Sequence, residues 1–134
     1  MKNARNTETL TGAPLVAIVD DDESVREAME SLIRCLGLRA ESYDSAEGFL
    51  LAGKLAETDC LILDVKMPGM GGMALQGLLS GIKPPLPTIF ITAHWDEEAR
   101  LEAMRLGAVD FLRKPCSEEA LLNAVQLALA VNKT

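Results

Sequence analysis

The chain has 134 residues, of which 49% are hydrophobic and only 4% aromatic. This is the usual size of one domain whose core is built from aliphatic side chains. The formal net charge of -7 argues against direct binding of nucleic acid, because such binding depends on clustered Lys and Arg. The sequence shows neither the apolar core of a signal peptide nor an apolar run near the ~20 residues that span a bilayer. We therefore expect a cytoplasmic domain over residues 14–134 that makes no membrane contact, preceded by a flexible tail over residues 1–13.

The cysteines also favour a cytoplasmic location. Cys35, Cys60 and Cys116 are an odd number, have no C-x-x-C spacing, and each lies in or beside an apolar run. We expect buried or partly buried free thiols, as in a reducing cytosol, in preference to disulfides or a zinc site.

Short apolar runs alternate with helical patterns along the chain. The predicted strands cover residues 15–19, 38–43, 60–63, 88–91 and 109–112. The predicted helices cover residues 25–36, 73–79 and 96–106, with one more after residue 44 and another after residue 117. Asp44 with Glu47 forms a capping box for the second helix, and Ser117 is a good N-cap for the last one.

This alternation predicts an α/β fold with one parallel sheet. Helices on both faces and right-handed crossovers make such a sheet doubly wound. For five strands the natural arrangement is the flavodoxin-like (βα)5 fold with strand order 2-1-3-4-5. Ligands of such folds bind beyond the carboxyl ends of the strands, so residues there converge in space.

Polar side chains stand at these predicted carboxyl ends. Asp20 and Asp21 follow the first strand, Asp64 the third, Thr92 the fourth and Lys114 the fifth. Three carboxylates repel one another unless a hard cation neutralises them, and Mg²⁺ is the economical choice. A carboxylate can attack phosphorus while a metal and a lysine neutralise the developing charge. The sequence therefore predicts a phosphoryl site with Asp64 as nucleophile and with Lys114 and Thr92 contacting the phosphoryl group.

Three other interpretations stay open at this point. Residues 20–22 could merely cap the first helix, although capping does not explain Lys114. A phosphohydrolase or transferase of the haloacid dehalogenase type also uses a strand-end aspartate, but it needs an acid two residues later, where Lys66 stands. A phosphorylation-independent interaction module on the same scaffold is a further alternative.

Four motifs carry a family resemblance over residues 15–131. They are VDDD at 19–22, LDVKMPGMGG at 63–72, ITAH at 91–94 and FLRKP at 111–115. With this spacing the chain resembles the receiver domain of two-component response regulators, most closely the FixJ/NarL-type branch.

The resemblance implies the roles of the site residues. Asp64 would be the phosphoacceptor, with a sensor histidine kinase as donor and with no catalysis beyond the domain's own phosphorylation and dephosphorylation. Asp21, Asp64 and the backbone carbonyl of Lys66 would bind Mg²⁺ directly, and Asp20 would bind it through water. The peptide bond between Lys114 and Pro115 would be cis.

The resemblance also implies a switch and an output. Thr92 and Phe111 would form a switch pair that turns phosphorylation into a change of packing, although Phe111 could equally be ordinary core. The surface of the fourth helix, fifth strand and fifth helix would then change, and phosphorylation would promote a homodimer through the fourth helix and fifth strand. Trp95 could anchor a partner or simply cover its loop. The output would be transcription through a DNA-binding domain absent from this chain, or protein contact by a stand-alone regulator.

Overall fold

The computed structural model describes residues 12–82 and 85–133. The predicted tail over residues 1–13 lies almost entirely outside the described residues. The sheet has five strands in the order β2-β1-β3-β4-β5, and all four neighbouring pairs are parallel, which confirms the predicted topology. The strands are β1 (Leu15–Val19), β2 (Arg39–Tyr43), β3 (Cys60–Asp64), β4 (Thr88–Thr92) and β5 (Asp110–Arg113).

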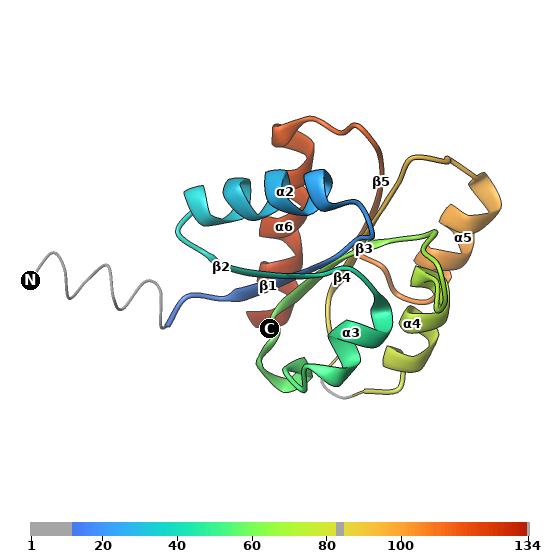
Figure 1. Cartoon of the computed structure of the whole chain (residues 1–134), viewed down its shortest axis with the longest axis horizontal. Coiled ribbons are helices and arrows are strands. Elements are labelled where there is room, and N and C mark those ends of the chain that lie inside the picture. Colours follow the sequence, from blue (N-terminus) through green and yellow to red (C-terminus); the bar gives the residue numbers. More distant parts are fainter. Residues whose placement is uncertain (1–11, 83–84, 134) are drawn as a thin grey trace, which may run out of the picture.

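Helices cover both faces of this sheet, with α2 and α6 on one side and α3, α4 and α5 on the other (Figure 1). They are α2 (Glu23–Cys35), α3 (Ala46–Leu51), α4 (Gly72–Leu79), α5 (Glu97–Arg105) and α6 (Glu118–Lys133), and a short 3-10 helix, η1 (Leu55–Glu57), precedes β3. Ser117 caps α6 as expected, since its Oγ accepts a hydrogen bond of 3.0 Å from the backbone N–H of Ala120. The predicted alternation of strands and helices is therefore confirmed, with ends that differ by one or two residues.

The start of α3 corrects one prediction. The N-cap is Ser45, whose Oγ accepts a hydrogen bond of 2.9 Å from the N–H of Gly48, so the capping box of Asp44 with Glu47 is wrong. Because the helix begins one residue later than expected, Glu47 occupies its second position and cannot reach back to the cap. Its side chain instead accepts a hydrogen bond from the N–H of Met70.

The cysteines need a second correction. Cys60 is buried and Cys116 is half-buried, but Cys35 is exposed, contrary to the expectation for an apolar run. Cys35 follows Ile33 by two residues on α2, and Ile33 is fully buried against the sheet. Two residues correspond to about 200° around a helix axis, so Cys35 faces solvent.

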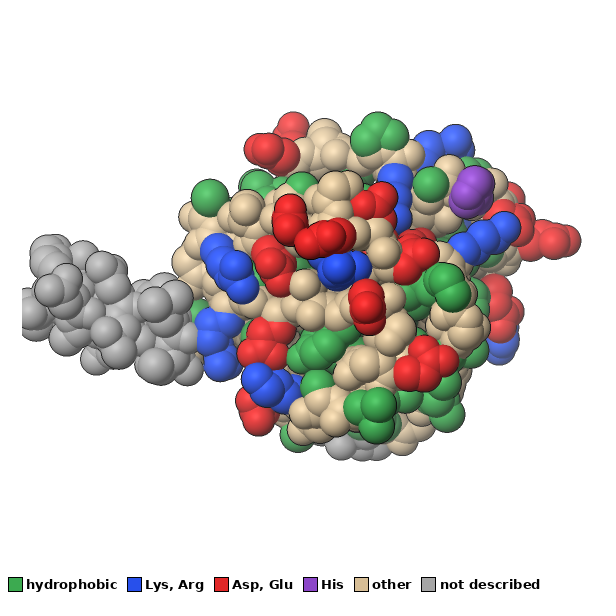
Figure 2. All heavy atoms as spheres, in the orientation of Figure 1, with side chains coloured by type: hydrophobic (Ala, Val, Ile, Leu, Met, Phe, Trp, Pro, Cys, Tyr) green, Lys and Arg blue, Asp and Glu red, His purple; other side chains and the backbone are tan. Residues whose placement is uncertain are grey.

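Two hydrophobic clusters lie on the two faces of the sheet. Alternate strand residues point to opposite sides, so each strand supplies both clusters. None of the described helices combines the length and the apolar composition needed to cross a bilayer. In the face shown in Figure 2, basic and acidic side chains are interspersed, so this face has no continuous basic patch of the kind that holds nucleic acid.

Candidate functional site

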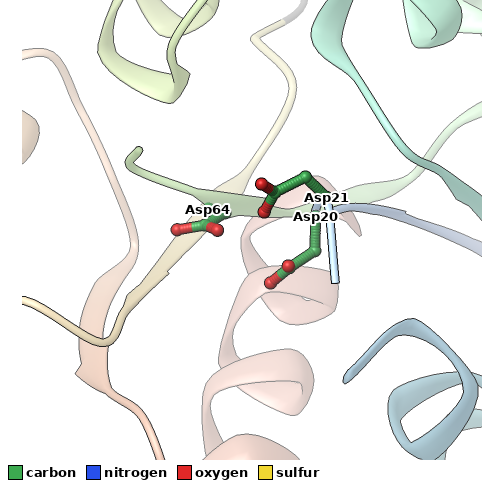
Figure 3. A group of neighbouring side chains, drawn as sticks. All are labelled: Asp20, Asp21 and Asp64. Atoms are coloured by element: carbon green, nitrogen blue, oxygen red, sulfur yellow. The ribbon is translucent and has the colours of Figure 1, made fainter. Parts of the chain in front are cut away.

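Three carboxylates meet at the carboxyl edge of the sheet, where two neighbouring strands end (Figure 3). Asp20 and Asp21 follow β1, and Asp64 is the last residue of β3. One oxygen from each lies within 4.8 Å of the others. The structure thus brings together three of the residues that the sequence analysis singled out.

Lys114, from the loop after β5, is the cation of this group. Its Nζ lies 2.7 Å from Oδ2 of Asp20 and 3.3 Å from Oδ2 of Asp64, and its side chain is 17% exposed. Burial by itself would lower the pKa of Lys114, but the hydrogen bond and charge of Asp20, followed by those of Asp64, raise that pKa above its usual value. Lys114 therefore stays protonated between the two carboxylates.

Asp64 lies in a setting that disfavours its charge. Burial raises the pKa of its carboxyl group above the usual range, and the charge of Asp20 raises it further, against an opposing effect of Lys114. The N–H of Lys66 donates a weak hydrogen bond of 3.3 Å to Asp64 Oδ1. The negative charge of the Asp64 carboxylate is thus only partly neutralised by other groups of the chain.

The donor set fits a hard divalent cation. Oδ2 of Asp20 is fully buried and, apart from its ion pair with Lys114, has no aligned hydrogen-bond donor among the described residues. Lys114 sets one positive charge against the three carboxylates of this group, and a bound divalent cation would relieve the repulsion that Asp20 exerts on Asp64. Closely spaced carboxylate oxygens are the ligands that Mg²⁺ prefers.

Helix capping accounts for only one of the three consecutive aspartates. Asp22 is the N-cap of α2, where its Oδ1 accepts hydrogen bonds from the N–H groups of Ser24 and Val25. Asp20 instead accepts from the N–H of Asp22 at 2.9 Å and stays buried, while Asp21 is exposed. The alternative that residues 20–22 serve only as caps therefore fails for Asp20 and Asp21.

Thr92 lies at the end of the next strand and connects two loops of the site. Its hydroxyl accepts a hydrogen bond of 3.0 Å from the N–H of His94 and donates one of 3.2 Å to the carbonyl of the same residue. Its own carbonyl accepts a 2.7 Å hydrogen bond from the N–H of Lys114. The following peptide bond, between Lys114 and Pro115, is cis.

Phe111 lies on the same face of the sheet as Thr92, between two other rings. Its centroid is 6.0 Å from that of Phe90 and 5.2 Å from that of Trp95. Trp95 meets it edge to face, remains 36% exposed, and also lies under the guanidinium of Arg113 at 5.0 Å. The contact with Phe111 places Trp95 against β5, and both the covering of its loop and the binding of a partner stay predictions.

Sequence reasoning missed two polar groups that hold the site loops. The guanidinium of Arg26 donates a 2.8 Å hydrogen bond to the carbonyl of Asp20, and Glu47 accepts one from the loop after β3. Arg26 lies in the first turn of α2, six residues after Asp20, so nearness along the sequence is the signal that could have pointed to this contact. Glu47 belongs to another element, and no local pattern signals its partner.

The fold and the site define a class: a flavodoxin-like domain with an acidic pocket and a partly buried lysine at the carboxyl edge of its sheet. Residues 16–126 match the family model described as the response regulator receiver domain. The chain belongs to this family.

Relatives and solved structures agree with this assignment. The chain is 46% identical over 116 residues to the response regulator protein TmoT of Ectopseudomonas mendocina, covering 86% of this chain and 52% of TmoT. It is 36% identical over 113 residues to the transcriptional regulatory protein FixJ of Rhizobium meliloti, covering 84% of this chain and 55% of FixJ. The crystal structure of FixJ-N matches with a TM-score of 0.78 and 36% identity, over 87% of this chain and 94% of that one.

A second solved structure belongs to a longer protein, of which this chain matches only a part. The low-resolution structure of the response regulator StyR matches with a TM-score of 0.82 and 43% identity, over 90% of this chain and 61% of StyR. The chain thus spans about half the length of the curated relatives it matches.

Proposed function

We propose that this receiver domain accepts a phosphoryl group on Asp64 from the phosphohistidine of a sensor histidine kinase. The observation that carries the proposal is the position of Asp64: a buried strand-end carboxylate with Lys114 Nζ at 3.3 Å and with Asp20 and Asp21 beside it. An oxygen of Asp64 forms a bond to phosphorus, and the P–N bond of the donor breaks. Its electron pair stays on the imidazole nitrogen.

The surrounding residues of the chain stabilise that transfer. The ammonium of Lys114 is already within reach of Asp64 and neutralises charge on the phosphoryl oxygens. Asp20, Asp21, Asp64 and the carbonyl of Lys66 are the groups that would hold Mg²⁺. When bound, this ion supplies positive charge against the phosphoryl oxygens.

Thr92 and Phe111 form the proposed switch. The hydroxyl of Thr92 forms both of its hydrogen bonds with the backbone of His94. A phosphoryl group on Asp64 would be a more strongly charged acceptor than the carbonyl of His94. A hydroxyl that turns toward this acceptor releases the loop and vacates space beside Phe111. The surface of α5, β5 and α6 then changes its shape.

The proposed setting is a cytoplasmic signalling pathway that ends in transcription. Its support is that FixJ, one of the longer relatives, is named a transcriptional regulatory protein. In this setting the partners are a sensor kinase, an output domain, and a second copy that pairs through α5 and β5 after phosphorylation. The three cysteines of the chain, all free thiols, are compatible with a reducing compartment. The domain catalyses only its own phosphorylation and dephosphorylation.

Labelling with a small phosphodonor and Mg²⁺ tests the proposal. We expect one acid-labile phosphoryl group per chain, located on Asp64 by mass spectrometry, and complete loss of label in Asp64→Asn. Asp44→Asn, which changes an exposed aspartate, is the matched control and should label like the parent. Rapid multiple turnover without stable label would indicate a phosphohydrolase, and no reaction would indicate an interaction module; either result contradicts the proposal.

A further inference from the structure

The loop between β3 and α4 carries one of the proposed metal ligands and is held at both ends by its own residues. The N–H of Lys66 donates to the side chain of Asp64, and the N–H of Gly72 donates a 2.9 Å hydrogen bond to the carbonyl of Val65. Between these two bonds the loop contains Met67, Pro68, Gly69, Met70 and Gly71, and the side chains of Met67 and Met70 pack against the hydrophobic cluster of this face. The backbone of the loop has a further partner on another element.

Glu47 of α3 is that partner. Its Oε2 accepts a 2.9 Å hydrogen bond from the N–H of Met70, across 23 residues of sequence. This hydrogen bond lowers the pKa of the Glu47 carboxyl group below its usual value, so the acceptor is ionised at neutral pH. A hydrogen bond to a charged acceptor is roughly twice as strong as one between neutral groups.

The contact between α3 and the loop is close enough to restrict the sequence. Gly69 has φ of +77°, and a Cβ atom on it would lie 2.9 Å from Oε2 of Glu47. A side chain at Gly69 would thus strain the backbone and displace the Glu47 carboxylate. The absence of a side chain at Gly69 therefore leaves the space that the Glu47 carboxylate occupies.

We propose that Glu47 is a positioning residue for the metal site, because its bond to the N–H of Met70 fixes the loop and thereby the direction of the Lys66 carbonyl. This inference rests on the proposed function, in which that carbonyl is a metal ligand. Groups that orient metal ligands without touching the ion commonly decide a large part of metal affinity. Glu47 plays this part from a helix that contributes no ligand of its own.

Three substitutions of Glu47 separate the hydrogen bond from the charge. Glu47→Ala removes both, Glu47→Gln keeps an oxygen acceptor of the same length without charge, and Glu47→Asp keeps the charge but is one methylene too short to reach Met70. Glu57→Ala is the control, since Glu57 is an exposed acid on η1 at the opposite end of the sheet. Far-UV circular dichroism checks that each variant is folded.

Two measurements on the full chain test the inference without any phosphodonor. The first is hydrogen exchange of the Met70 amide in the absence of metal, and the second is calorimetric titration with Mg²⁺ alone. We expect faster exchange and about tenfold weaker Mg²⁺ binding in Glu47→Ala and Glu47→Asp, the low end of the loss known for residues that orient metal ligands. Glu47→Gln should stay within about threefold of the parent because a neutral bond retains part of the strength.

The outcomes distinguish this inference from the proposed function. Unchanged Met70 exchange, or Mg²⁺ affinity in Glu47→Asp like that of the parent, overturns the role of Glu47 even if Asp64 accepts phosphate. A loss in Glu47→Gln as large as in Glu47→Ala also overturns it, because charge alone would then be responsible. If the parent binds Mg²⁺ but Asp64 takes no phosphoryl group, the proposed function fails while the positioning of the metal site by Glu47 is still supported by the two measurements.

Discussion

The two faces of the central sheet are covered in different ways. Against one face, α2 with 13 residues and α6 with 16 residues pack an aliphatic cluster. Against the other, α3, α4 and α5 have only 6, 8 and 9 residues. Their cluster contains all three phenylalanines of the chain, Phe49, Phe90 and Phe111.

The remaining aromatic residues also lie on the face covered by α3, α4 and α5. Tyr43 packs against the same cluster, and Trp95 contacts the edge of Phe111. A short helix gains less from tertiary packing than a long one, so it shifts at lower cost in free energy. The comparison indicates that the long helices α2 and α6 give the site its firmer support, and that the short helices α3, α4 and α5 can shift more easily. In the proposed switch we therefore expect α5 to move more than α6.

The largest expected effect comes from matched cavities in the two faces. Leu121→Ala on α6 and Leu75→Ala on α4 remove side chains that are 3% and 0% exposed, and each should lower the free energy of unfolding by about 2–5 kcal/mol. The loss should be greater for Leu121→Ala, because a cavity under a short, adaptable helix collapses more completely. Urea unfolding measures both values.

The controls for this pair lie on the same helices. Leu127 of α6 and Leu78 of α4 are 54% and 59% exposed, and their substitution by Ala should change the free energy of unfolding by less than about 0.5 kcal/mol. An equal or larger loss for Leu75→Ala than for Leu121→Ala would break the distinction between a firmer face and a more adaptable one.

A smaller effect is expected at the strand ends, where the two faces meet. Burial and then the charge of Asp20 raise the pKa of Asp64, so the folded chain holds this proton more firmly than the unfolded chain does. The free energy of unfolding therefore falls as the pH rises from the usual Asp pKa to the raised pKa of Asp64 in the folded chain. It stays lower at higher pH. Asn cannot ionise, so Asp64→Asn should raise the free energy of unfolding at neutral pH by about 0.5–2 kcal/mol, a usual gain when a strained functional site is relieved.

Urea unfolding at two pH values, without divalent cations, checks this prediction. The gain should vanish near pH 3, where the carboxyl group of Asp64 is protonated in both states, at roughly one unit below the usual Asp value. Asp44→Asn should show no gain at either pH, because Asp44 is exposed. A gain for Asp64→Asn that is equally large at low pH would show that its carboxylate is not the source of strain.

The smallest expected effect is a change in tryptophan fluorescence, and it concerns only the face covered by α3, α4 and α5. The chain has one tryptophan, and Trp95 contacts Phe111 at 5.2 Å between ring centroids. Its fluorescence should therefore change on treatment with phosphodonor and Mg²⁺, and Phe111→Leu should abolish that change at a cost of about 1 kcal/mol in stability. Phe49→Leu, on the same face but in contact with Tyr43, should leave the change intact. A full response in Phe111→Leu would remove Phe111 from the switch.

The sequence was sufficient for the fold and for the residues that meet at the candidate site, because both depend on local pattern. Buried parallel strands are short apolar runs, and a residue that ends such a run, such as Asp64 or Thr92, necessarily lies at the carboxyl edge of the sheet. Lys114 could be assigned in the same way from its position after β5. Their convergence is a consequence of strand order, which the alternation of elements already specifies.

Only the tertiary structure decided which partner each remaining polar or aromatic group takes. Glu47 has the spacing of a capping residue, yet it binds Met70, because α3 begins at Ala46 and packs beside the loop after β3. The position of Trp95 between Phe111 and Arg113 likewise depends on how α5 meets β5. Contacts between elements arise from the way that their surfaces pack, and periodicity along the chain carries no record of that packing.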